Sequence, residues 1–434
     1  TSSKEEVKKQ VGNNDEAKKV EKKGSGWFSG ILNIFTPQDD GYTKANLPDG
    51  NQFVYDSVKK KWVMQGAEEE EEEEEELPPS DAMLGSAPSL PAVDALDASG
   101  PSALVSASAP ALSSVSQDAP VKEDIIDKDS RPFSGSIAIS DNHNRYVNYQ
   151  AGIGITPDSI FMLGSISKTI TATLVLQAVD QKKLALSDNI TDYLEIITEH
   201  PITISQLLNH TSGITPPKSP SLNAGSQFIP ASQFSYSNYG YKLLGDILTQ
   251  VYQQPYGQLV NQFALTNQLD LQANTGSIAQ RQAKQTRLVD GYTEQQQQRT
   301  QLTDFTVDPD FITFGGMQAS SAAVVKFVNG LHQGQFLSAT SYHAMTHAST
   351  IRQHRWGEVG YGYGLQISQQ AGLVEYSHSG YIPGYISLML YYPQSQLTVV
   401  ILENTSWDLD NIERVFGLHD KIRQAVRKQL TTYE

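Results

Sequence analysis

The residues that could carry chemistry form three short groups that follow one another along the chain: Ser165-Ile166-Ser167-Lys168, Tyr236-Ser237-Asn238 and His378-Ser379-Gly380. Serine is a poor nucleophile unless a neighbouring base takes its proton. On a helix, Ser165 and Lys168 would lie on one face, within reach of each other. Burial disfavours the charged form of lysine, so a buried Lys168 could be neutral and accept that proton. Tyr236 could then relay the proton to a leaving group. The pattern therefore predicts nucleophilic catalysis by a serine.

Each group alone is a weak signal, because the same chain holds a second copy of every pattern. Ser57 begins another Ser-x-x-Lys, Tyr146 begins another Tyr-x-Asn, and His332 begins another His-x-Gly. Ser57 stands beside a tract of low complexity, Tyr146 falls in an expected edge hairpin, and His332 follows an amphipathic helix. The first set alone has its members in order at expected element boundaries, and this favours it as the reactive set.

The elements that must position these groups begin and end with strands. Residues 134–140 and 146–150 alternate between apolar and polar side chains around a turn, which predicts a β-hairpin. Near the other end, 385–392 and 397–402 are strand-like, and 411–430 has the pattern of a helix. Strands at both ends with helices between them predict an α/β fold in which one antiparallel sheet is assembled from both ends of the region, with a helical insertion against it.

Helical patterns within the insertion place the reactive groups at helix starts. Residues 166–176 are apolar on nearly every side, which predicts a buried helix that Ser165 would open. Its hydroxyl would then meet the positive end of the helix dipole. Thr203 and Gln206 have capping-box spacing, and apolar residues recur at helical spacing over 243–251. The Tyr-Ser-Asn group is therefore expected on the loop just ahead of that second helix.

The first 129 residues differ from the rest in composition. The formal net charge of the whole chain is -16, and within the first 129 residues an unbroken run of glutamates spans Glu68–Glu76 before an Ala/Ser/Pro-rich tract. Such a stretch buries too little apolar area to offset chain entropy. We expect residues 1–129 to form a disordered acidic leader with a short Trp-containing motif at 27–63, and residues 130–434 to form the folded domain. The acidic charge argues against nucleic-acid binding.

Other classes are excluded by what the sequence lacks. There are no cysteines, so disulfides and thiolate sites are impossible. No run approaches the roughly 18 apolar residues of a membrane span. Without an apolar N-terminal segment the chain is expected to be cytoplasmic as written, or periplasmic or secreted if a signal peptide has been removed. His343 and His347 stand four residues apart without a third ligand, so no metal or other cofactor is expected.

The ordered motifs resemble one known family over roughly residues 131–430. They comprise Phe161-x-x-Gly164-Ser165-Ile166-Ser167-Lys168, Leu207-Leu208-Asn209-His210-Thr211-Ser212-Gly213, Tyr236-Ser237-Asn238, Phe314-Gly315-Gly316, Gly360-Tyr361-Gly362-Tyr363-Gly364 and His378-Ser379-Gly380. Together they resemble the class C β-lactamases, D,D-peptidases and esterases. The resemblance implies the serine β-lactamase and penicillin-binding-protein-like fold, an antiparallel sheet flanked by helices with a helical subdomain. It also implies acyl transfer through an ester of Ser165 without a cofactor.

The same resemblance assigns roles to further residues. The backbone N–H groups of Ser165 and Tyr381 would form the oxyanion hole, and Asn238 would bind the acyl-side amide of the substrate. His378, Ser379 and Gly380 would line the substrate. We expect His210 to be structural.

One motif departs from class C β-lactamases, which have Lys-Thr-Gly where this chain has His378-Ser379-Gly380. An imidazole is largely neutral at pH 7 and becomes charged below about pH 6.5. It would hold a carboxylate less strongly than an ammonium group does. In having His-x-Gly the chain resembles the D,D-carboxypeptidases, D-aminopeptidases and many esterases of the family. This resemblance implies small or peptide acyl donors as substrates, such as esters and D-amino-acid amides or peptides, with no more than weak β-lactamase activity.

Residues 20–80 carry a separate resemblance. Trp27-Phe28, Leu47-Pro48-Asp49 and Tyr55-Asp56, followed by Trp62-Val63 and acidic sequence, are similar to the C-terminal region of the scaffold proteins of COPII coats at endoplasmic reticulum exit sites. The alternative function is therefore a non-enzymatic scaffold of the secretory pathway that carries an inert hydrolase-like domain. The acidic leader would then bind a protein partner.

Overall fold

The computed structural model describes residues 52–56, 61–65, 132–142, 145–217, 223–295 and 298–432. The chain divides into two units, one of Ala45–Val121 and the other of Thr1–Lys44 with Lys122–Glu434. In the smaller unit, β1 (Gln52–Asp56) and β2 (Lys61–Gln65) form an antiparallel hairpin. The rest of the expected leader 1–129 and of its 27–63 motif lies outside the described residues. The boundary at 129/130 stays a prediction.

One eight-stranded antiparallel sheet organises the larger unit, in the order β12-β13-β14-β15-β16-β17-β3-β4. The expected hairpin at 134–150 is confirmed, and it pairs with the strand expected at 397–402, so both ends of the region build one sheet. The strands are β3 (Gly135–Ser140), β4 (Tyr146–Ala151), β12 (Thr350–His354), β13 (Gly357–Tyr361), β14 (Gln366–Gln370), β15 (Leu373–Ile382), β16 (Tyr385–Tyr392) and β17 (Leu397–Glu403).

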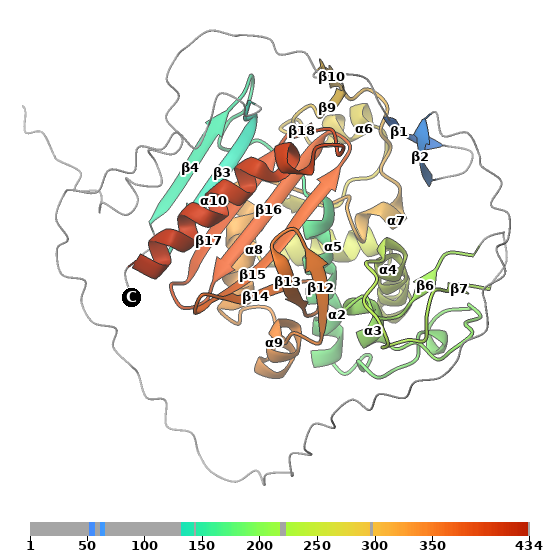
Figure 1. The fold of residues 1–434 in the computed structure, drawn as a ribbon. Coiled ribbons are helices and arrows are strands. Elements are labelled where there is room, and N and C mark those ends of the chain that lie inside the picture. Colours follow the sequence, from blue (N-terminus) through green and yellow to red (C-terminus); the bar gives the residue numbers. More distant parts are fainter. Residues whose placement is uncertain are drawn as a thin grey trace, which may run out of the picture. The chain divides into compact units, whose positions relative to one another are not determined.

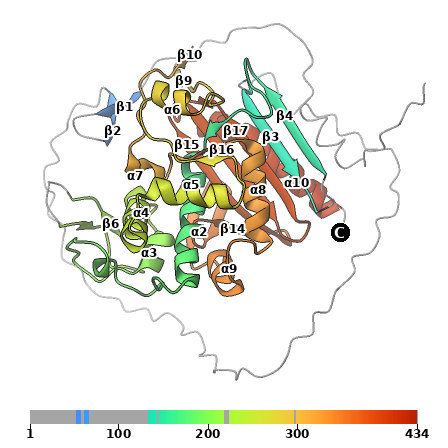
Figure 2. The ribbon, with the colours of Figure 1, turned by 180° about the vertical axis from the view of Figure 1, so that it is seen from behind.

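Helices cover both faces of this sheet. Helix α10 (Ile412–Thr432) lies across one face in Figure 1, and α8 (Ser321–His332) lies on the opposite face in Figure 2. The period-two alternation of strands explains this: Ile137 and Ile139 pack with Ile422 of α10, whereas Ala138 joins the core beneath the helical insertion. The fold is thus the expected sheet between helical layers.

The insertion contains the remaining helices and three small sheets. Its helices are α2 (Ser167–Asp180), α3 (Ile204–Leu208), α4 (Asn238–Tyr252), α5 (Tyr256–Thr266), α6 (Ile278–Lys284), α7 (Pro309–Ile312) and α9 (Ala339–Thr346), with 3-10 turns η1 (Gly164–Ile166) and η2 (Ile190–Asp192). The small sheets pair β5 (Phe161–Met162) and β8 (Leu271–Gln272) with β11 (Gln318–Ala319), β6 (Ile214–Thr215) with β7 (Gly225–Ser226), and β9 (Tyr292–Gln295) with β10 (Gln298–Gln301) and β18 (Thr405–Ser406).

Two helix predictions can be compared with the structure directly. Helix α2 is buried over most of its surface, as its apolar pattern predicted, but it begins at Ser167 rather than at Ser165. The capping box is confirmed at α3, where the Thr203 hydroxyl accepts from the Gln206 N–H and the Gln206 side chain accepts from the Thr203 N–H. Helix α3 ends at Leu208, so the helix that begins at this capping box is short.

A buried ion-pair network fastens α10 to β15. The carboxylate of Glu375 is fully buried and accepts from Arg423 Nε at 2.8 Å, from Arg427 Nη1 at 3.1 Å and from the Tyr392 hydroxyl at 2.8 Å. Removing one member of a buried ion pair leaves the others charged and unpaired, which costs more free energy than the pair itself contributes. The network therefore holds the strand that carries His378 and Gly380.

The free energy of unfolding of the Glu375→Gln variant should be about 3 kcal/mol lower than that of the wild type, because the buried Arg423 and the partly buried Arg427 lose their counter-charge. The measurement is urea unfolding followed by circular dichroism. The matched control is Glu358→Gln, since Glu358 is an exposed residue that accepts from the Gln353 side chain at 2.9 Å. Equal stability of the two variants would contradict the role given to Glu375.

Candidate active site

Ser165 lies in the 3-10 turn η1, which packs against the C-terminal part of β15. Gly164 has φ +53°, and a Cβ there would come within 3.1 Å of Gly380 Cα and 3.2 Å of Tyr381 N. A Cβ on Gly380 would come within 2.8 Å of Ser165 N. Both glycines are needed for this close approach. The contact brings the backbone nitrogens of Ser165 and Tyr381 to one place, as the oxyanion-hole prediction requires.

Lys168 points from the first turn of α2 to the partly exposed Ser165. Its Nζ lies 3.1 Å from Ser165 Oγ and donates to the Phe314 carbonyl oxygen at 2.9 Å. The Lys168 side chain is 0% exposed, and burial lowers its pKa well below the ordinary value of 10.5. No carboxylate among the described residues pairs with it. The amine is therefore suited to accept a proton from the serine.

Tyr236 lies on the loop before α4, as predicted. The centroid of its ring is 4.8 Å from Lys168 Nζ. The side chain is 37% exposed, and the protein around it still desolvates its hydroxyl group. This desolvation raises the pKa of Tyr236 above 10, partly offset by the hydrogen bond with Ser165 and by the charge of Arg352. Tyr236 is thus protonated at neutral pH.

Strand β15 offers an edge of backbone to this site. It pairs with β14 from Leu373 to Ser377 and with β16 from Tyr376 to Ile382. Residues 378–382 therefore have a strand on one side only, and η1 packs against them. Ser379 is partly exposed on this stretch, and Gly380 is buried beside η1.

Asn238 is the first residue of α4, and its side chain is exposed. The preceding Ser237 caps that helix by accepting from the Gly240 N–H at 2.9 Å. The cap places Asn238 two residues from Tyr236 at the start of a fixed helix. Its predicted contact with the substrate's acyl-side amide stays a prediction.

A directional chain of hydrogen bonds runs behind the site through two buried histidines. The Ser237 N–H donates to His210 Nδ1 at 3.1 Å, so in the neutral ring Nε2 carries the hydrogen and donates to the Tyr361 oxygen at 3.2 Å. At the other end, His378 Nδ1 donates to the Ser379 carbonyl at 2.8 Å, so Nε2 accepts from the Tyr361 hydroxyl at 3.1 Å. One tautomer of each histidine satisfies all four bonds. The chain ties the Tyr236 loop to β15.

The structure corrects the expectation that His378 becomes charged near pH 6.5. The side chain is 1% exposed, and burial, together with the charge of Lys168, lowers its pKa to about 3. Both ring nitrogens are already engaged within the protein. His378 therefore stays neutral across the physiological range and is not a substitute for the Lys of Lys-Thr-Gly.

His210 is buried beside it, in agreement with the structural role expected from the sequence. Burial lowers its pKa well below 6.5, and the charge of Lys168 lowers it further. Its backbone has φ +61°, a conformation that costs energy for a residue with a side chain. In this conformation the His210 ring accepts from the Ser237 N–H, so the structural role of His210 is to hold the Tyr236 loop.

Three members of this site had motifs but no assigned function in the sequence. The Phe314 carbonyl, the Tyr361 hydroxyl and the Ser237 N–H belong to quoted motifs, and their roles appear only when distant elements meet. Arg352 belongs to no motif, and nothing in the sequence indicated a role for it at this site. The other copies of the patterns lie elsewhere: Tyr146 is in β4, and His332 is stacked on Tyr391 with ring centroids 3.9 Å apart.

Within the described ranges, no cluster of three or more His, Asp or Glu side chains could hold a metal ion. His343 and His347 are exposed at the end of α9, with ring centroids 5.9 Å apart. None of the helices in those ranges is both long enough and apolar enough to cross a membrane.

The Tyr361→Phe variant should lose about 2 kcal/mol of unfolding free energy and roughly tenfold in kcat for a small ester, because two buried imidazole nitrogens lose their partner and the Tyr236 loop loosens. Tyr342→Phe is the matched control, since the Tyr342 hydroxyl lies 2.9 Å from Nδ1 of the partly buried His332 elsewhere in the fold. It should lose stability without losing kcat. Similar kcat values for both variants would show that the chain does not position the site.

The sequence profile of the family described as Beta-lactamase matches residues 128–413. The chain is 25% identical over 311 residues to penicillin-binding protein 4 of Amycolatopsis lactamdurans, a match that covers 61% of this chain and 78% of that protein. It is 33% identical over 90 residues to the teichoic acid D-alanine hydrolase of Staphylococcus aureus, covering 19% of this chain and 23% of that one.

The fold is also that of known proteins. A penicillin-binding protein from Bacillus halodurans aligns with a TM-score of 0.56 and 20% identity, covering 68% of this chain and 95% of that one. The resemblance of residues 20–80 to COPII scaffolds is not shown by these similarities and stays a prediction. Because the family profile spans more than half of the chain and the serine β-lactamase-like fold is present, the protein belongs to the β-lactamase family of serine hydrolases.

Proposed function

We propose that this protein hydrolyses esters or D-amino-acid amides and peptides through an acyl-enzyme on Ser165, and that residues 130–434 carry the activity. The single observation that supports this most is the amine of Lys168, fully buried and 3.1 Å from Ser165 Oγ. Burial without a counter-charge favours the uncharged amine, which is the form that can accept a proton. The hydrolase and penicillin-binding names of the relatives support the same substrate class.

The proposed reaction moves one proton in each half. As Ser165 Oγ attacks the acyl carbonyl, Lys168 Nζ takes the hydroxyl proton, and the Ser165 and Tyr381 N–H groups stabilise the oxyanion. The proton then passes through the Tyr236 hydroxyl to the leaving group as the tetrahedral intermediate collapses to the Ser165 ester. In the second half, water gives a proton to the same relay as it attacks that ester. When the second tetrahedral intermediate collapses, the acid leaves and the relay returns the proton to Ser165 Oγ.

The substrate lies, in this proposal, along the open edge of β15. Ser379 and Gly380 line it there, and Asn238 binds the acyl-side amide from the opposite wall. The neutral His378 supports this edge from behind rather than binding the substrate through its ring. Weak β-lactamase activity is consistent with this arrangement, because His378 supplies no positive charge for the β-lactam carboxylate.

Ser165→Ala should abolish labelling by a fluorophosphonate probe and turnover of a p-nitrophenyl ester, with a thermal midpoint within a few degrees of the wild type. The reason is that the probe reacts with the activated serine alone, while a single hydroxyl contributes only about 1 kcal/mol to folding. The measurement is intact-mass spectrometry of the full chain, with one bound probe expected per wild-type molecule and none on the variant.

The chain supplies its own control for this experiment. Ser57 begins the second Ser-x-x-Lys, so Ser57→Ala should retain full labelling. Absence of labelling in the wild type would favour the alternative, a scaffold with an inert hydrolase-like domain. Labelling that persists in Ser165→Ala would assign the nucleophile to another residue.

A further inference from the structure

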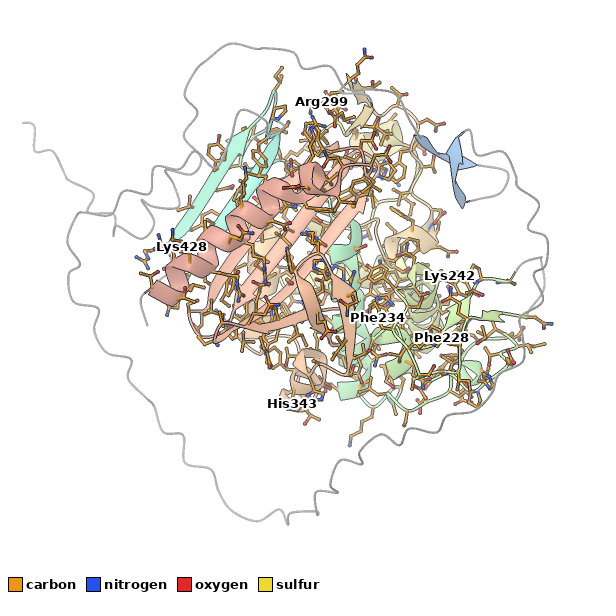
Figure 3. All side chains as sticks on the ribbon, in the orientation of Figure 1. Phe228, Phe234, Lys242, Arg299, His343 and Lys428 are labelled. Carbon is orange, nitrogen blue, oxygen red and sulfur yellow. The ribbon has the colours of Figure 1, made fainter. Side chains whose placement is uncertain are left out.

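Arg352 reaches the site from β12, the edge strand of the main sheet. Exposure alternates along β12, so that Thr350, Arg352 and His354 lie on its half-buried face. The Arg352 guanidinium carbon is 5.5 Å from the ring centroid of Tyr236 and 5.5 Å from that of Phe234. Phe234 lies between the β12–β13 hairpin and α4 in Figure 3. The guanidinium is therefore at the wall of the site, against the tyrosine.

Among the arginines that the structure describes, Arg352 differs from the others because its guanidinium has no polar partner. Arg355 pairs with Asp420, Arg423 with Glu375, and Arg287 with Asp270. Among the residues that the structure describes, no hydrogen bond or ion pair is made by the Arg352 side chain, and its Nε is buried. A partly buried cation without a counter-charge is costly unless something else provides one.

Arg352 brings a positive charge to this part of the site. Its charge lowers the pKa of both His210 and His378, so the guanidinium acts on the buried region behind Tyr236. The flanking rings of Phe234 and Tyr236 leave the planar fork of the guanidinium a restricted orientation. A positive potential within low-dielectric walls attracts anions, and the fork of arginine matches a carboxylate in a bidentate manner.

We propose that Arg352 is a specificity-determining residue that binds a carboxylate carried by the leaving group of the substrate. We place this carboxylate on the leaving group because Arg352 contacts Tyr236, the residue that gives the proton to the leaving group in the proposed function. The inference therefore rests on the proposed function. Arg352 thereby supplies the permanent charge that the buried, neutral His378 does not. The substrates it favours are acyl donors whose leaving group is anionic.

The test compares two esters that differ only in charge, 3-carboxyphenyl acetate and 3-carbamoylphenyl acetate, on the full chain. The wild type should prefer the carboxylate ester by about tenfold in kcat/KM, mainly through KM, since a partly solvated arginine–carboxylate pair contributes on that order. Raising the ionic strength from about 0.05 M to about 0.5 M should reduce the preference.

In Arg352→Gln the ratio of kcat/KM for the two esters should fall to about one, and Arg352→Lys should keep part of the preference. The matched control is Arg287→Gln, which removes one positive charge from a surface ion pair and should keep the wild-type ratio. A wild-type ratio in Arg352→Gln, or an equal fall in Arg287→Gln, would overturn the inference while leaving the proposed function intact. Failure of the wild type to hydrolyse either ester would instead overturn the proposed function, and this inference with it.

Discussion

The burial of one amine beside one hydroxyl is the interaction on which the rest of this structure depends. Lys168 is 0% exposed, with Nζ between Ser165 Oγ and the Phe314 carbonyl. Keeping a lysine there costs folding free energy, because the chain must hold it uncharged or charged without a counter-ion. In the proposed function, the fold bears that cost in order to hold a base beside the serine. Strain and unusual pKa values gather where function requires them.

Several elements serve to keep this pair enclosed and aligned. Helix α2 is buried on nearly every side, and Gly364 allows the segment after β13 to approach it so closely that a Cβ would come within 2.9 Å of the Lys168 carbonyl oxygen. Gly164 does the same for β15 on the other side. The His210–Tyr361–His378 chain then fixes the Tyr236 loop through neutral groups, so that no second titrating charge competes with Lys168.

Much of this could be predicted from the sequence, because local patterns carry it. The apolar run after Ser165, the capping box at Thr203 and the alternating strands each depend on neighbours a few residues away. The role of His378 could not be predicted, since its pKa depends on burial by the whole fold and its ring is held by Tyr361, 17 residues distant. The start of α2 was placed two residues early because the 3-10 turn at Gly164 has no separate signal. Arg352 belongs to no motif, and only the folding of β12 against Tyr236 gives it a function.

The measurement that tests this account most directly is the titration of Lys168 itself. In protein labelled with ¹³C at the lysine side chains, nuclear magnetic resonance follows the ionisation of each amine, and the Lys168→Gln variant identifies the resonance of Lys168. The account predicts one lysine that titrates well below 10.5 and whose signal is absent from that variant. If the Lys168 resonance titrates near 10.5 with the exposed lysines, the amine is a cation at neutral pH and cannot be the base that activates Ser165.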